Sequence, residues 1–130
     1  MANATSPVRI EGSRSSAPPD IATVRATARR LLAADAEAPA PDELASLTAR
    51  LRRDITSLIP VVEALTRTLP ETDVPRACAL ACIGEARMRL RLGDGGNATV
   101  RLSVAVRLAR TANALADHHQ ALSHSTRRTS

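Results

Sequence analysis

The strongest pattern in the chain is a repeat of apolar side chains between residues 42 and 69. Leucine recurs at every seventh position and apolar residues fill the alternating positions, at Leu44, Leu47, Leu51, Ile55, Leu58, Val62, Leu65 and Leu69. This spacing places all of them on one face of a helix. Pro60 lies inside the pattern, and no good capping residue precedes it. We therefore expect one helix over residues 42–69, kinked at Pro60, rather than two helices.

A shorter helix is predicted over residues 20–35. Asp20 follows two prolines and is expected to cap this helix by accepting a backbone N–H. Apolar residues then recur at helical spacing, at Ile21, Val24, Ala28, Leu31 and Leu32. Alternating alanine and proline at residues 38–41 separate this helix from the next one.

A third helix is predicted over residues 73–92. Asp73 is expected to cap it, and Pro75 lies in the first turn, where a missing N–H does no harm. From Ala77 to Ile83 every residue is apolar or small, so no side of the helix is polar over two turns. A helix of this kind is typical of the middle of a bundle, and we expect this one to be central.

Residues 98–122 fit two patterns. Alternate residues from Ala98 to Leu108 are apolar, as in a strand, but no other segment offers a strand partner. The segment also carries an apolar helical face, made of Val100, Val104, Leu108, Ala112, Leu115, His119 and Leu122. We therefore expect a helix over residues 98–122, with Asn97 as its cap.

The four segments together predict an all-α fold, a small antiparallel bundle of about four helices. The short connections make consecutive helices antiparallel neighbours within one domain over residues 20–122. Residues 1–19 are rich in serine and proline, and residues 123–130 are polar. Both tails are therefore expected to be disordered.

Composition and charge narrow the function. The chain has no Phe, Tyr or Trp, so it lacks the stacking platforms of modules that bind single-stranded nucleic acid. Its net charge of +5 allows an anionic partner without requiring one. No apolar run approaches the roughly 18 residues of a membrane span, and the first twenty residues do not resemble a secretory signal. A cytoplasmic protein with reduced cysteines is predicted.

Cys78 and Cys82 lie four residues apart, on one face of the third predicted helix. Their parallel Cβ vectors argue against a disulfide between them. Two thiolates could supply half of a zinc site, with His118, His119 or His124 completing it. We instead expect two small buried packing residues, because free cysteine is among the most buried residue types. No metal site and no cofactor are predicted.

Glu85 is the acidic candidate for a functional or structural polar site. It follows the apolar half of the third helix on the face that carries Arg89, and we expect it to be partly buried. A buried carboxylate needs a partner, which Arg89 at i+4 could be. The arginines of the fourth predicted helix are further natural partners for Glu85 and for Glu63: Arg101, Arg107 and Arg110. A general acid or base would need a second poised group, and the sequence names none.

Asp117 and His118, with His119, form a histidine-rich spot near the end of the fourth helix. The helix dipole favours histidine there, which accounts for the spot without catalysis. No catalytic residue is predicted. Arginines occur on every predicted helix, whereas a nucleic-acid reader gathers its cations on one face. The thirteen acidic residues dilute them further. We therefore expect solvated arginines rather than specific recognition of nucleic acid.

Several stretches within residues 42–122 carry a resemblance. They are residues 58–65 (LIPVVEAL), Leu69-Pro70, residues 73–87 (DVPRACALACIGEAR), residues 107–110 (RLAR), residues 113–115 (NAL) and Asp117-His118. Together they resemble a family of small actinomycete proteins labelled natural-product biosynthesis proteins. His119 stands where that family commonly has an aromatic residue. The resemblance implies a biosynthetic context and supplies no active site.

Three functional hypotheses follow. The first is a non-enzymatic accessory or interaction role in actinomycete secondary metabolism, with an unidentified protein partner, no membrane and a homodimer left open. The second is a small regulator that contacts DNA or a transcription factor, which requires one continuous basic face. The third is an enzyme built around Glu85 and the histidines, which requires a concave polar pocket that contains Glu85.

Overall fold

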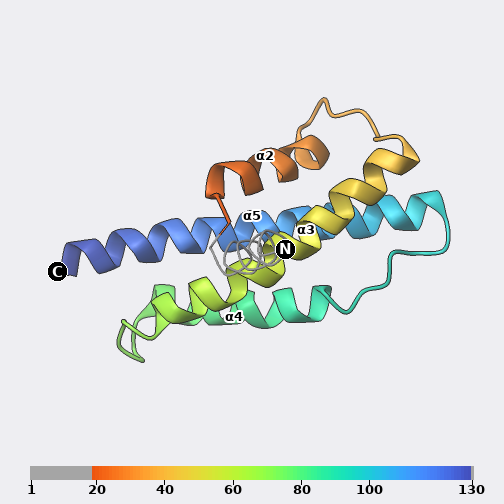
Figure 1. Ribbon diagram of the computed structural model, residues 1–130. Helices are drawn as coiled ribbons and strands as arrows, with labels where there is room; N and C mark the ends of the chain where they lie inside the picture. The colour runs from red at the N-terminus through yellow and green to blue at the C-terminus, as the bar shows by residue number, and fades with distance from the viewer. Residues whose placement is uncertain (1–18, 130) are drawn as a thin grey trace, which may run out of the picture.

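The computed structural model describes the backbone of residues 19–129 and the side chains of residues 19–124, and this part of the chain forms four helices. They are α2 (Ile21–Leu32), α3 (Pro41–Thr66), α4 (Val74–Arg89) and α5 (Ala98–Thr129), packed as a bundle (Figure 1). No strand occurs in residues 19–129. The predicted all-α class is confirmed, and the strand alternative for residues 98–108 is excluded. The tail predicted over residues 1–19 lies, up to residue 18, outside the described residues.

The central helix is α5, not α4 as the sequence predicted. α5 packs against each of the other three helices and most extensively against α3 (Figure 1). α4 packs against α3 and α5 only, and it buries one face, made of Ala79, Cys82, Ile83 and Ala86. The prediction was wrong because a helix without a polar side can also lie at the edge of a bundle, provided that its exposed apolar residues are small.

The repeat on α3 forms the middle of the core. Leu51, Ile55, Leu58 and Val62 are all fully buried. The helix is continuous through Pro60, as predicted, and the proline itself is exposed. Towards the ends of the repeat, Leu47, Leu65 and Leu69 are only partly buried. The apolar pattern therefore identified the core face and was strongest where the helix contacts its neighbours.

Two of the three predicted helix caps are confirmed. The Asp73 carboxylate accepts a hydrogen bond from the backbone N–H of Arg76 at 2.9 Å. The Asn97 side-chain oxygen accepts one from the N–H of Val100, also at 2.9 Å. Asp20 stands at the N-cap of α2 but accepts no backbone N–H; the Thr23 hydroxyl donates to its carboxylate instead, at 2.8 Å.

Most helix ends differ from the predicted ones. α2, α3 and α4 end three residues early, at Leu32, Thr66 and Arg89 rather than at residues 35, 69 and 92. After α3 and α4 the chain continues in tighter turns, in which an N–H bonds to the carbonyl three residues back. α5 instead continues to Thr129, past the predicted end at residue 122. No glycine or proline follows Leu122 to stop it, so residues 123–129, predicted to be disordered, have helical backbone.

Arginine side chains tie the helices to one another. Arg25 of α2 forms an ion pair with Asp117 of α5 at 2.8 Å. Arg30 binds both carboxylate oxygens of Glu43, each at 2.9 Å, and so joins α2 to α3. Arg52 of α3 donates to the carbonyl oxygens of Leu90 and Leu92 and to Asp94, which holds the loop after α4. These arginines serve the fold, and the sequence did not single them out.

No helix in the described part of the chain has both the length and the apolar character needed to cross a membrane.

Candidate functional site

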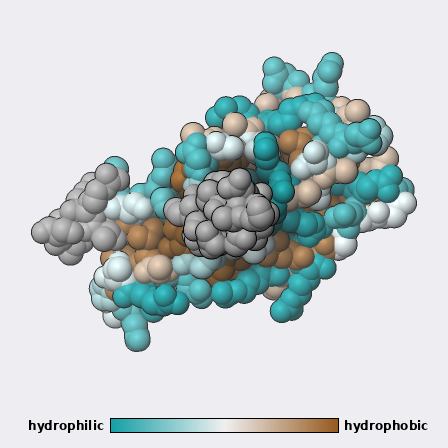
Figure 2. All heavy atoms as spheres, in the orientation of Figure 1, coloured by the Kyte–Doolittle hydropathy of each residue, from teal (hydrophilic) through white to brown (hydrophobic). Residues whose placement is uncertain are grey.

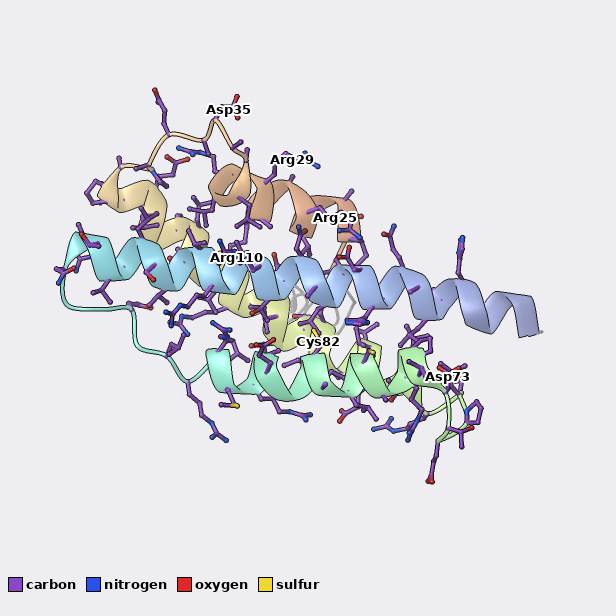
Figure 3. The ribbon with its side chains drawn as sticks, turned by 180° about the vertical axis from the view of Figure 1, so that it is seen from behind. Arg25, Arg29, Asp35, Asp73, Cys82 and Arg110 are labelled. Carbon is purple, nitrogen blue, oxygen red and sulfur yellow. The ribbon has the colours of Figure 1, made fainter. Side chains whose placement is uncertain are left out.

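An open groove lies between α4 and α5, on the face of the bundle turned away from α2 and most of α3. Figure 3 looks onto this side, with α5 in front and α4 beside it. The groove has a volume of about 1150 Å³. Its apolar part consists of Ala81, Gly84, Met88, Leu92 and Ala114, and its polar part of Glu85, Arg89, Arg107, Arg110 and Thr111. It is therefore an apolar trough bordered by charged groups.

The small residues of α4 leave this groove unfilled. Gly84 has no side chain, and a Cβ placed there would meet nothing within 4 Å. Ala81, one turn earlier, contributes a single methyl group. Met88 is 67% exposed although it is a large apolar side chain. Other residues fill the core beneath α4, so these apolar residues are not needed there. They form the floor of the groove and are in contact with solvent.

The groove brings together four of the six polar positions that the sequence singled out: Glu85, Arg89, Arg107 and Arg110. Glu85 pairs with Arg89 at 3.2 Å, which confirms one of its predicted partners. The Glu85 side chain is 61% exposed, so the expectation that it is partly buried was wrong. It was wrong because α4 turns this face to solvent instead of lying at the centre.

Arg107 and Arg110 are exposed, and neither forms an ion pair within the described residues. The suggested pairing with Glu63 is not found; Glu63 lies near Arg87, at 3.2 Å, and near Arg67, at 4.0 Å. Figure 3 shows Arg110 on the side of α5 nearest the viewer, away from α3. With Glu85 and Arg89 neutralising each other, the groove carries two uncompensated positive charges.

Arg101, the other exposed arginine in the first half of α5, does not line the groove. Arg101 lines a separate hollow with Arg52 and Asp94, at the N-terminal end of α3. Arg107 and Arg110 line the α4–α5 groove. Arg101 therefore does not share one continuous basic face with Arg107 and Arg110.

Asp117 and His118 are not part of the groove. Asp117 is used in the ion pair with Arg25 of α2, which fixes the docking of α2 on α5. Arg25 also donates to the side chain of Gln120 on α5. His118 is half-buried. The ion pair of Asp117 fits the interpretation of this spot as structural. The sequence did not indicate Arg25 as the partner of Asp117, because the two residues lie far apart along the chain.

The two cysteines have different environments. Cys82 is buried between α4 and α5, as predicted (Figure 3). Burial raises the pKa of its thiol, and the nearby Glu85 and Asp117 carboxylates raise it further. Cys78 is exposed, which corrects the prediction that both are buried. One turn separates them, and only Cys82 reaches the buried face of α4.

A second hollow lies where the start of α2, the end of α3 and the C-terminal half of α5 meet. Its lining includes Ile21, Leu65, His119 and His124. The Nδ1 atom of His119 is buried there and has no hydrogen-bond partner. Figure 2 shows hydrophobic residues, in brown, at the surface of the face that it presents. No group of three or more His, Cys, Asp and Glu side chains in the described part of the chain is arranged to hold a metal ion.

The apolar half of the groove escaped prediction from the sequence. Gly84, Met88 and Leu92 lie on α4 or just after it, and Ala114 lies on α5. A signal was present, since the segment from Ala77 to Met88 holds more apolar and small residues than one buried helix face needs. That excess was assigned to a central helix rather than to an exposed face.

Comparison with known proteins places the chain in a family. The family described as a family of unknown function, DUF6415, matches residues 22–124, which cover α2 to α4 and most of α5. No curated protein and no solved structure matches the chain. Because the match covers most of its length, the chain belongs to the DUF6415 family.

Proposed function

We propose that the chain is a non-enzymatic accessory protein that binds a partner protein through the α4–α5 groove. The observation that carries this proposal is the exposure of apolar side chains along the groove, with Met88 67% exposed above the open space at Gly84. Contiguous exposed apolar surface bordered by polar groups is typical of a protein-interaction site. We infer secondary metabolism of an actinomycete as its setting from the resemblance of stretches within residues 42–122 to proteins labelled natural-product biosynthesis proteins.

The regulator hypothesis is the alternative, supported by the absence of acidic residues between Asp94 and Asp117 while three arginines occur there. It requires one basic face, but Arg101 lies in a different hollow from Arg107 and Arg110. We expect binding to duplex DNA at low ionic strength to disappear by about 0.2 M salt through counterion competition. A shift of a specific promoter fragment that survives physiological salt and depends on Arg107 and Arg110 would favour the regulator.

The test of the proposed function blocks the groove without disturbing the fold. Gly84→Gln places a neutral side chain in the open space, at a helical position where glycine is unfavourable. Ala77→Gln is the matched control, because Ala77 is exposed on α4 but does not line the groove. Immobilised wild type and both variants are exposed to extract of the organism that encodes the chain, and retained proteins are identified by mass spectrometry.

We expect one protein to be retained by the wild type and by Ala77→Gln, and to be lost with Gly84→Gln. Circular dichroism of the variants shows whether each is folded, so that loss of binding is attributed to the groove. If the same proteins are retained by all three chains, the groove is not the binding site and the proposed function is wrong.

A further inference from the structure

We infer that the α4–α5 groove binds an acidic amphipathic helix of about three turns, supplied by the partner protein. This inference rests on the proposed function and adds the chemistry of the bound segment. It is carried by three properties of the groove: its length, its apolar floor and its uncompensated positive charge.

The length of the groove follows from α4. The groove residues run from Ala81 to Leu92, eleven steps along the chain. The eight steps from Ala81 to the end of α4 at Arg89 span about 12 Å at a rise of about 1.5 Å per residue, and the tighter turns through Leu92 extend the groove to about three turns. Since α4 and α5 are antiparallel neighbours (Figure 1), Ala81 lies towards Ala114 and Met88 towards Arg107. A helix lying along this trough would contact the α4 side over about three turns and α5, from Arg107 to Ala114, over about two turns.

The floor of the groove selects an apolar stripe. Gly84 and Ala81 leave room for side chains from outside, and Met88 and Leu92 offer flexible apolar contacts. Apolar residues spaced i, i+3, i+4 and i+7 on a bound helix form a stripe of matching width. Methionine adapts to varied shapes because it is unbranched, which suits it to a binding surface.

The charge of the groove selects an acidic segment. Arg107 and Arg110 form no ion pair among the described residues, whereas Glu85 is already paired with Arg89. Carboxylates beside the apolar stripe of a bound helix would pair with the two free guanidinium groups. A cationic segment would meet like charges instead.

Other occupants lack this complementarity. A second copy of the chain that docked through the same face would add a second Arg107 and a second Arg110 to the interface and so double its uncompensated positive charge. Residues 1–18 carry Arg9 and Arg14 against one acidic residue, Glu11, so they do not complement the groove either. An acidic helix from another protein fits both the floor and the charge.

Met88 allows the inference to be tested directly at the groove. The chain has two methionines, Met1 and Met88, so labelling with [methyl-13C]methionine gives one resonance in the groove and one internal reference. The probe is a synthetic helical peptide with leucine at positions i, i+3, i+4 and i+7 and glutamate beside them. The control peptide has lysine in place of glutamate. The protein is the full chain at physiological salt.

We expect the glutamate peptide to shift the Met88 resonance saturably while Met1 stays unchanged, and the lysine peptide to leave both unchanged. Arg107→Ala/Arg110→Ala is expected to weaken binding roughly tenfold. The matched control Arg29→Ala/Arg50→Ala removes the same charge from α2 and α3 outside the groove, and we expect it to bind like the wild type. Figure 3 shows Arg29 on α2, on the other side of α5 from α4.

Three results would overturn the inference. One is an unchanged Met88 resonance, and another is an equal response to both peptides. The third is a Met88 shift that depends on protein concentration without any peptide, which would identify a second copy as the occupant. If the glutamate peptide fails while partner capture still depends on Gly84, the acidic helix is wrong and the proposed function stands. If capture does not depend on Gly84, the proposed function itself fails.

Discussion

Two glycines in the α4–α5 segment are expected to respond with opposite signs to the same substitution. Gly84 lies inside α4, where its backbone is helical and a Cβ would meet nothing within 4 Å. Glycine in a helix interior lowers the free energy of unfolding by about 1 kcal/mol relative to alanine, because a chain with glycine loses more conformational freedom when it folds. Gly84→Ala is therefore expected to raise the free energy of unfolding by about 0.5–1 kcal/mol.

Gly95 lies in the loop between α4 and α5 and has a φ of 103°, which side chains disfavour. A Cβ there would lie 2.6 Å from Cγ1 of Val100 and 3.1 Å from the backbone nitrogen of Arg101. The nitrogen belongs to the first turn of α5 and cannot move away without disturbing the helix. Gly95→Ala is expected to lower the free energy of unfolding by about 1–3 kcal/mol.

The assay is urea unfolding followed by far-UV circular dichroism, because the chain has no aromatic residue to give a fluorescence signal. A change of midpoint at constant slope reports stability rather than a change in compactness. If Gly84→Ala destabilised the chain as much as Gly95→Ala, the space beside Gly84 would be filled in solution. The groove, and both proposals that depend on it, would then have no structural basis.

Three further outcomes are expected. Leu51→Asp puts an unpaired charge at a fully buried position, at a cost above about 4 kcal/mol, and should abolish cooperative unfolding; a transition near the wild-type midpoint would contradict the assigned core. A disulfide reagent should titrate one thiol quickly, exposed Cys78, and one slowly, because burial raises the pKa of Cys82; two equally slow thiols would contradict this. Burial raises the pKa of Asp54 above 3.8 in the folded chain, although two nearby arginines oppose the shift. The folded chain is therefore more stable when Asp54 is protonated, and this stability is lost as the pH rises through the raised pKa. Asp54→Asn should therefore stabilise the chain at neutral pH and less below pH 3.8, as measured by urea unfolding at both pH values.

The fold was predictable where local pattern and burial coincide. The repeat on α3 named Leu51, Ile55, Leu58 and Val62 correctly because a long single stripe has only one way to face a core. Helix starts were predictable from capping chemistry at Asp73 and Asn97. Helix ends were not, because the last turns of α3 and α4 tighten without any residue that marks the change.

The place of α4 was not predictable from its own residues. An apolar, small-residue helix presents the same pattern whether three helices surround it or two. The choice depends on α5, whose buried residues include Ala105, Ala109, Ala112 and Ala116. These small side chains allow neighbouring helices to approach α5 closely on several sides, so α5 takes the central position. That reversal turned Glu85 outward and exposed Cys78.

The candidate site was predictable in part for the same reason. Glu85, Arg89, Arg107 and Arg110 were named as polar candidates, but their meeting in one groove depends on the antiparallel register of α4 and α5. The ion pair between Glu85 and Arg89 needs only i,i+4 spacing on one helix, so the sequence contained it. The freedom of Arg107 depends on which carboxylates lie nearby, and the sequence does not specify that.

The groove differs from the rest of the bundle in how its residues contribute to stability. Arg25, Arg30 and Arg52 each hold two elements together, whereas Arg107 and Arg110 form no ion pair in the described structure. Buried apolar residues stabilise the fold in proportion to the area removed from water, and Met88, at 67% exposure, contributes little of this. Folding therefore accounts for Arg25, Arg30 and Arg52 and leaves Arg107 and Arg110 without a partner in the described structure. A partner that buries Met88 and pairs with the two free arginines would supply both missing interactions at once.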